Sequence, residues 1–148
     1  MRILIIGPFF PPRIGGVEKV LYYLAKGFQK RKFEVTVVVG KHDEKTKGHE
    51  FYDGVEVYRI KNSIPSAWLF FLKHMDLIRR SDMVHAHGKF FWYFPFRFLF
   101  PFKPVLTIYH GADARISLFG RTARRIAIGL SYDFLYVGRY AAERARMK

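Results

Sequence analysis

The chain has 148 residues and a formal net charge of +14. This length suffices for one domain with a substantial core and excludes two full catalytic domains. Half of the residues are hydrophobic, which excludes a disordered protein, and the absence of cysteine excludes disulfides, thiolate metal sites and cysteine nucleophiles. The basic excess predicts attraction to phosphate groups of a nucleic acid, an anionic lipid or a nucleotide.

The first forty residues predict a βαβ unit. Residues 2–7 contain an apolar run, which is typical of a strand that is buried on both faces of a parallel sheet. After a Pro/Gly-rich loop, apolar side chains recur at helical spacing from Val17 to Phe28 and predict an amphipathic helix. A second strand over residues 34–39 ends at Gly40, and the crossover between the two strands should be right-handed.

The rest of the chain continues this alternation. The expected strands cover residues 54–60, 82–87, 105–110 and 132–137, and the expected helices cover residues 66–80, 120–130 and 140–147. Residues 41–50 are hydrophilic and predict a solvent loop. In the helix over residues 66–80, Ser66 is the expected cap, and Leu69, Leu72, Met75 and Ile78 share one face. About six strands alternating with helices predict a single domain over residues 1–148 with a doubly wound parallel α/β sheet.

Two glycines stand where such sheets bind ligands, beyond the carboxyl end of a strand. Gly15 and Gly16 come directly before the first helix. Glycine lets the backbone approach a phosphate closely, and a helix start offers free N–H groups and a partial positive charge. The segment matches neither the dinucleotide fingerprint nor the Walker loop, and a simple tight turn is the alternative interpretation.

Histidines end two later strands of the expected sheet, those over residues 82–87 and 105–110. His85 and His87 lie at the end of one strand, and His110 lies at the end of the next. We expect His85 and His87 to point to opposite faces, so that only one of them faces the cleft, and such divergence disfavours a metal site. Each histidine alone is also explained by a structural role, but three such strand ends at one edge favour a functional site.

An aromatic segment follows, with nine aromatic side chains between Lys89 and Lys103. It is interpreted either as a helix that packs hard against the sheet or as an interfacial segment suited to a membrane surface. From residue 83 onward, eleven lysines and arginines accompany only three acidic residues. A solvated basic face or contact with anionic lipid would each explain this bias.

No run of apolar residues reaches the length of about 18 that a transmembrane helix needs. The apolar run after Met1 is also too short for a secretory signal. We therefore expect a cytoplasmic protein, peripheral on the inner membrane face if anionic lipid is its partner. The single Asn62 and the single Gln29 are a mild indication of a thermophilic source.

Three segments together resemble the glycosyltransferases of family 4, which have the two-domain GT-B architecture. They are residues 1–6 with the Pro/Gly loop 11–19, then residues 82–88, then residues 107–113, in the family's order. Residues 131–147 are similar to the last strand and helix of the family's first domain, with Gly138 where a serine is usual. The resemblance covers essentially the whole chain. It implies a Rossmann-like domain that forms the N-terminal, acceptor-side half of a GT-B fold.

The resemblance also implies roles for single residues. Gly15 and Gly16 would lie against the diphosphate and sugar of the donor, and His87 and His110 would reach the sugar or the acceptor as catalytic residues. Glu18 and Asp113 would bind the acceptor or the sugar. The resemblance implies a retaining reaction. Independence of a metal is expected because no D-x-D motif is present. The nucleotide sugar is expected as substrate, and no cofactor is expected.

The family's nucleotide-binding second domain and its E-x7-E motif have no counterpart in the sequence. We therefore expect half an enzyme: a truncated gene, a cloned domain, or one subunit of a split transferase that is inactive alone. The expected partners are a nucleotide sugar, a glycan or lipid-linked acceptor, an anionic membrane surface, and a second subunit that carries the donor domain.

Two other functions are alternatives to this one. A phosphate- or nucleic-acid-binding α/β module would explain the basic excess. Nucleic acid is nevertheless an unexpected partner, because the aromatic residues cluster in one run with no basic interleaving beyond Arg97. A dehydrogenase fragment is disfavoured because Gly40 and Lys41 stand where an acidic residue should end the second strand.

Overall fold

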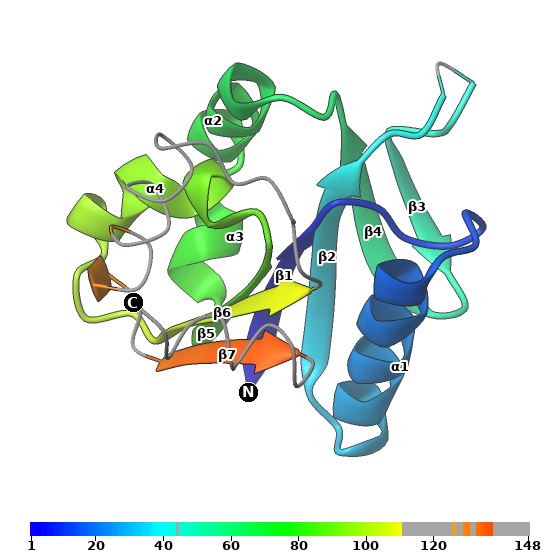
Figure 1. Cartoon of the computed structure of the whole chain (residues 1–148), viewed down its shortest axis with the longest axis horizontal. Coiled ribbons are helices and arrows are strands. Elements are labelled where there is room, and N and C mark those ends of the chain that lie inside the picture. The colour runs from blue at the N-terminus through cyan, green and yellow to red at the C-terminus, as the bar shows by residue number, and fades with distance from the viewer. Residues whose placement is uncertain (44, 111–125, 127–128, 131–132, 138–148) are drawn as a thin grey trace.

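The computed structural model describes residues 1–43, 45–110, 126, 129–130 and 133–137. In these residues a seven-stranded sheet is covered on one face by α1 and on the other by α2, α3 and α4 (Figure 1). The strands are β1 (Arg2–Gly7), β2 (Glu34–Gly40), β3 (His49–Tyr52), β4 (Val55–Ile60), β5 (Met83–His87), β6 (Val105–His110) and β7 (Asp133–Val137). The helices are α1 (Gly16–Lys30), α2 (Ile64–Lys73), α3 (Met75–Arg80) and α4 (Phe90–Leu99).

The strand order is β3-β4-β2-β1-β5-β6-β7, and every pairing except β3 with β4 is parallel. The chain builds outward from β1 on one side through β2 and β4, and then crosses to β5 on the other side. This reversal confirms the doubly wound fold and creates a topological switch point beside β1. Ile3 to Ile6 in β1 are all buried, as the wholly apolar run predicted.

Helix α1 confirms the predicted amphipathic helix. Leu21 and Ala25 are buried against the β1 and β2 side chains Ile5 and Val37, whereas Lys19 faces solvent. Gly15 precedes the first turn of α1 in an extended conformation and, having no side chain, makes no cap hydrogen bond.

The prediction of a single helix over residues 66–80 is wrong. The structure has two helices, and His74 ends α2 and precedes α3. Ser63, not Ser66, is the cap: its hydroxyl oxygen accepts a hydrogen bond from the Ser66 N–H at 3.4 Å. Pro65 in the first turn fits this start, because the first turn of a helix leaves N–H groups without intrahelical partners.

The four residues predicted to share a face are divided between the two helices: Ile78 of α3 is buried and Met75 packs against the core, but the two on α2 are not buried. Ala67 and Phe71 are buried, whereas Leu69 and Leu72 are exposed. The helix is apolar on nearly all sides, so periodicity alone did not distinguish its inner from its outer face.

Strand β3 begins inside a segment that was predicted as a solvent loop. It pairs antiparallel with β4 through a two-residue turn, Asp53-Gly54, in which both residues have positive φ (49° and 77°). Such turns match the twist of a hairpin, so backbone pairing forms even though His49 and Glu50 are polar.

The C-terminal strand is confirmed by β7, which pairs parallel with β6. Most of the predicted helix over residues 120–130, and all of the one over residues 140–147, lie outside the described residues. In the described part of the chain, no helix has both the length and the apolar content that crossing a bilayer requires.

Candidate active site at the carboxyl edge of the sheet

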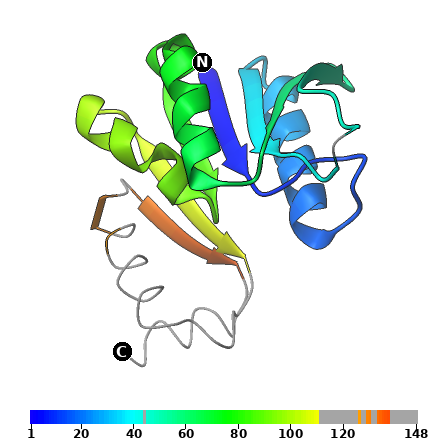
Figure 2. The same cartoon turned by 90° about the horizontal axis from the view of Figure 1, so that it is seen from above.

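The parallel strands β1, β2, β4, β5 and β6 all end at the same edge of the sheet, and helices α1, α2 and α4 begin from this edge (Figure 2). Open α/β sheets bind ligands at this edge, at the point where the strand order reverses. The loop over residues 8–15 leaves β1 there and crosses toward the start of α1. The predicted site residues therefore belong to one rim.

The loop over residues 8–15 is fixed at its beginning by the neighbouring strand. The Pro8 carbonyl accepts a hydrogen bond from the Gly40 N–H at 2.8 Å. A Cβ at Gly40 would lie 2.7 Å from the same oxygen, so the close approach of the two backbones requires glycine.

Arg59 fixes the middle of this loop. Its side chain is fully buried and donates to the Phe10 carbonyl at 3.3 Å and to the Pro11 carbonyl. Glu50 of β3 lies 2.7 Å from the same guanidinium and balances its charge. A buried arginine without such partners would be strongly destabilising, so the loop and β3 depend on each other.

Sequence reasoning missed Arg59, although a signal was present. Val55, Val57 and Arg59 alternate along β4, and the first two are buried. A charged residue in the third inward position of a strand needs a buried partner. That partner, Glu50, was hidden in the segment predicted as a loop.

The two glycines differ in their surroundings. A Cβ on Gly15 would collide with the Glu18 carboxylate, which folds back over this residue and lies 3.5 Å from the Arg13 guanidinium. A Cβ on Gly16 would have no atom within 4 Å. A side chain at position 15 would therefore require the flexible Glu18 side chain to move, whereas Gly16 leaves an open surface at the helix start.

Glu18 is buried, and its carboxylate contacts the loop. Its expected role in binding sugar or acceptor stays a prediction. No side chain caps α1 in the described residues, so the first N–H groups of this 15-residue helix have no side-chain acceptor, although the Glu18 carboxylate places a negative charge in the same turn.

The expectation that His85 and His87 point to opposite faces is wrong. Their rings are stacked with centroids 5.4 Å apart, and His85 Nδ1 lies 3.2 Å from His87 Nε2. The side-chain period of a strand is two residues, so positions i and i+2 share a face. Burial lowers the pKa of His85 to about 4, so this ring is neutral at physiological pH.

Lys89 and Asn62 are further rim residues that the sequence reasoning did not assign to the site. The turn after β5 uses Gly88, with φ of 64°, and places Lys89 Nζ 2.8 Å from Asn62 Oδ1 and 5.1 Å from the Trp92 ring centroid. Burial lowers the pKa of Lys89. Both residues follow strand ends, β5 and β4, so the rule that found the histidines applies to them too.

His110 is the last residue of β6, and its backbone pairs with Val137. The structure therefore confirms its position at the rim, while its side chain and Asp113 lie outside what the structure describes. The catalytic roles of His87 and His110 stay predictions.

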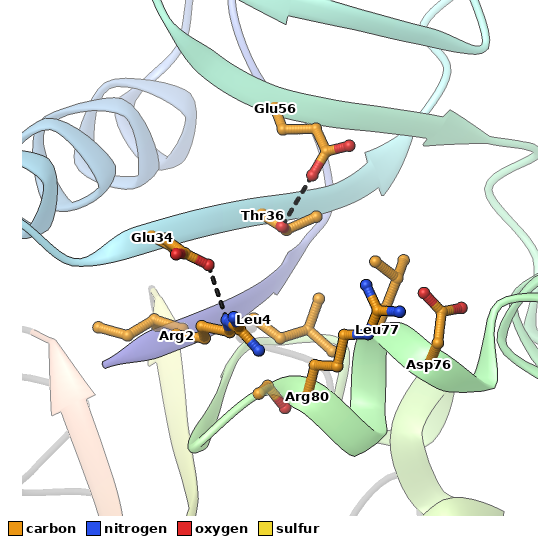
Figure 3. A pocket seen from close by; sticks show the side chains of 10 residues that line it. Arg2, Leu4, Glu34, Thr36, Glu56, Asp76, Leu77 and Arg80 are labelled. Atoms are coloured by element: carbon orange, nitrogen blue, oxygen red, sulfur yellow. Dashed lines mark hydrogen bonds and ion pairs between the residues drawn. The ribbon is translucent and has the colours of Figure 1, made fainter.

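A hollow exists at the opposite edge, between α3 and the amino-terminal halves of β1, β2 and β4 (Figure 3). Glu34, Glu56 and Asp76 line it together with Arg2 and Arg80. Glu34 pairs with Arg2 at 2.7 Å, and Glu56 accepts from Thr36 at 3.0 Å. This hollow carries charges of both signs and lies at the amino ends of the strands. Open α/β sheets bind ligands at the carboxyl ends, so we place the site there.

Comparison with known proteins fits the geometry of this rim. The sequence profile of Glycosyltransferase Family 4 matches residues 14–146, from the glycine loop to nearly the end of the chain. The chain belongs to glycosyltransferase family 4. No curated protein matches the sequence.

Solved structures of GT-B glycosyltransferases have the same fold as this family 4 domain. Sucrose-phosphate synthase from Thermosynechococcus elongatus has a TM-score of 0.75 at 11% identity, over 99% of this chain and 44% of that one. The catalytic domain of starch synthase IV from Arabidopsis thaliana, bound to ADP and acarbose, has a TM-score of 0.52 at 12% identity, over 74% and 34%. An alpha-glucosyltransferase in complex with UDP and a 13-mer DNA has a TM-score of 0.56 at 15% identity, over 92% and 37%.

This family 4 chain spans less than half the length of each of these three structures. The identities are low, so the likeness establishes the fold alone. That fold is the Rossmann-like N-terminal domain of the GT-B type, as the sequence motifs implied.

Proposed function

We propose that the chain is the acceptor-side half of a sugar-nucleotide-dependent, retaining glycosyltransferase that acts on a glycan or lipid-linked acceptor. In this reaction the acceptor oxygen forms a bond to the anomeric carbon, the bond to the diphosphate breaks, and the acceptor proton leaves with the departing nucleotide. A nucleotide-binding second domain, in the same or another chain, would complete the cleft and exclude water.

The observation that carries the proposal is the open start of α1. Gly16 has free space above it, the first N–H groups have no side-chain cap among the described residues, and the helix dipole adds partial positive charge. Such donors stabilise the charge that develops on a leaving diphosphate without requiring a metal ion.

The neighbouring strand ends support the same chemistry. The His85–His87 pair and Lys89 lie at the end of β5, directly beside β1. A neutral imidazole can hydrogen-bond a sugar hydroxyl, and an ammonium group can approach a phosphate. We assign a phosphate contact to Lys89. His87 is buried in the described structure, so its expected sugar contact stays a prediction.

The phosphate part of this proposal is testable with inorganic pyrophosphate and the isotope-labelled chain. We expect saturable shifts of the amide resonances of residues 16–18. Gly16→Leu should abolish these shifts because its side chain fills the open space. Gly27→Leu is the matched control, since Gly27 lies in the same helix and also has no atom within 4 Å of its Cβ position. Absent shifts, or equal shifts in both variants, would contradict the assignment.

Transfer itself is tested with a panel of labelled nucleotide sugars and a lipid extract. We expect turnover only when a nucleotide-binding domain is supplied with the chain. Robust transfer by the 148-residue chain alone would refute the need for a second domain. Saturable binding of duplex DNA at physiological salt would instead favour the nucleic-acid module.

A further inference from the structure

An apolar surface lies on the outer side of the helical layer formed by α2 and α4. Its residues, which we call the apolar face, are Ile64, Leu69 and Leu72 on α2, and Phe98, Leu99 and Phe102 at the end of α4 and just beyond it. Their exposed fractions range from 41% for Ile64 to 97% for Phe102. Clusters of exposed large apolar side chains mark interaction surfaces far more often than isolated ones do.

Contacts between the two helices make the surface continuous. Trp68 of α2 is partly exposed, and its Nε1 donates to the Phe91 carbonyl of α4 at 2.9 Å. From Phe91 a ladder of rings continues along α4, with centroids 5.5 Å apart from Phe91 to Phe94 and again from Phe94 to Phe98. Aromatic surface therefore extends from α2 to the far end of α4.

The outward side of α2 is unlike that of an ordinary surface helix. Ile64, Trp68 and Leu72 recur every four residues, and all three are exposed. An exposed helix of a soluble domain carries mainly polar residues at such positions. The outer side of α2 is therefore suited to an apolar environment.

Basic residues outnumber acidic ones in the part of the chain that holds both helices. Neither α2 nor α4 contains an acidic residue. Residues 61–103, which include both helices, hold only two acidic residues, Asp76 and Asp82. The basic residues in the same range are Lys61, Lys73, Arg79, Arg80, Lys89, Arg97 and Lys103. This arrangement complements an anionic surface.

We propose that the apolar face docks the domain onto a bilayer that contains anionic lipids. Leucine and aromatic side chains would enter the boundary between headgroups and acyl chains, and the basic residues would contact phosphates. A half-exposed tryptophan such as Trp68 is typical of this boundary. For the apolar part of such a surface the sequence alone pointed to residues 89–103, but Phe90, Trp92, Tyr93 and Phe96 of that segment are buried, and α2 supplies half of the surface.

The position of the apolar face connects it to the rim. Helices α2 and α4 both begin at the carboxyl edge, directly after β4 and β5 (Figure 1). A bilayer on this face would lie beside the site and bring a lipid-linked acceptor within reach. This last connection rests on the proposed glycosyltransferase function, whereas the docking itself does not.

The experiment measures co-flotation of the full chain with vesicles in the absence of any nucleotide sugar, so its outcome is independent of transferase activity. We expect strong binding to vesicles with equal parts phosphatidylcholine and phosphatidylglycerol at low salt. We expect weak binding to pure phosphatidylcholine, and release from the mixed vesicles as salt screens the phosphates. Negligible binding to the mixed vesicles at low salt would overturn the proposal.

A double variant tests whether this face is responsible. Leu72→Gln with Phe98→Gln should lower the partition coefficient by about tenfold or more, because two large apolar side chains no longer enter the lipid. Phe51→Gln is the matched control: Phe51 is 70% exposed, but it lies on β3, and the change should leave binding intact. All three positions are exposed, so the variants should fold, and their thermal midpoints check this.

A charge variant tests the lipid phosphates separately. Lys73→Glu should weaken binding to the mixed vesicles severalfold, whereas Lys47→Glu in the loop before β3 should not. Equal losses in the test and control variants would show general electrostatic attraction and overturn the specific face. In the alternative outcome, the wild type forms a dimer, binds no vesicles, and becomes monomeric in the double variant. That result would assign the face to a second copy of the chain and overturn the proposal.

Discussion

The two faces of the sheet bury different kinds of side chain. On the α1 face, an aliphatic cluster encloses buried polar groups, among them Arg59, His85 and His87. On the face of α2, α3 and α4, the buried layer is almost entirely apolar, and the outer side of α2 is apolar too. The α1 face thus holds the loop and rim by directed hydrogen bonds, while the other face depends on packing.

The two faces of the sheet therefore differ in how far their stability depends on charge. Buried polar groups are tolerated only with partners, and their partners on the α1 face are parts of the candidate site. Changes in pH or charge should therefore disturb the site side of the sheet first. Changes in side-chain volume should act most strongly on the other side.

The largest effect is expected from truncating the inner side of α2. Phe71→Ala should lower the free energy of unfolding by about 3–5 kcal/mol, because a fully buried ring leaves a cavity. Leu72→Ala, one position further, should change it by no more than about 0.5 kcal/mol, because Leu72 is exposed. Urea unfolding of both variants measures the difference, and equal losses would show that α2 is oriented differently.

The α1 face should lose stability on acidification. Since the pKa of His85 is about 4 in the folded chain and 6.5 when solvated, only the unfolded chain takes up this proton between those values. The stabilisation is complete above pH 6.5 and is lost as the pH falls through this window, by about 3 kcal/mol in total. His85→Leu should flatten the profile of unfolding free energy against pH in this window. A profile parallel to that of the wild type would contradict the buried neutral ring.

Removing the buried guanidinium should loosen the loop over residues 8–15. Arg59→Met deprives two loop carbonyls and Glu50 of their donor and should cost about 2–3 kcal/mol, since Glu50 is partly exposed and can rehydrate. Limited proteolysis should then cut within the loop before it cuts elsewhere. Arg2→Met is the control, because its ion pair with Glu34 is exposed and worth little. Unchanged protection of the loop would argue against the Arg59 clamp.

The buried layer between the sheet and helices α2, α3 and α4 should tolerate the loss of a polar atom. The Tyr93 hydroxyl is buried and has no hydrogen-bond partner among the described residues, and burial raises its pKa to about 12. Tyr93→Phe should therefore be neutral or raise the free energy of unfolding by up to about 1 kcal/mol. Chemical denaturation provides the measurement, and a clear loss of stability would reveal a partner for this hydroxyl.

The sequence predicted the sheet well because apolar runs in β1 and β2 and amphipathic periodicity in α1 each have one physical explanation. It also placed Gly15, Gly16 and His87 at one rim, because parallel strands end at a common edge. It failed at α2, where apolar residues on nearly all sides leave the buried face undetermined.

The site was predicted less completely than the fold. Arg59 and Glu50 form their ion pair across a hairpin, and the polar composition of β3 concealed that hairpin. Strand geometry alone puts His85 and His87 on the same face, so the expectation of opposite faces was an error of reasoning. The stacking of their rings could not be read from the sequence, because it depends on packing against α1, where Phe28 lies 5.8 Å from the His85 ring.

The hairpin of β3 and β4 also bears on the order in which the chain folds. It is the antiparallel pair joined by two residues, whereas each parallel pairing in the described part of the sheet joins strands that are far apart in sequence. Hairpins close within about 1–10 microseconds, so this pair can form before the rest of the sheet and serve as a template for β2. Its turn then attaches α1, since the Tyr22 hydroxyl donates to Asp53 at 2.5 Å. A φ-value near zero for Gly54→Ala, against higher values in β1, would show that this nucleus forms late.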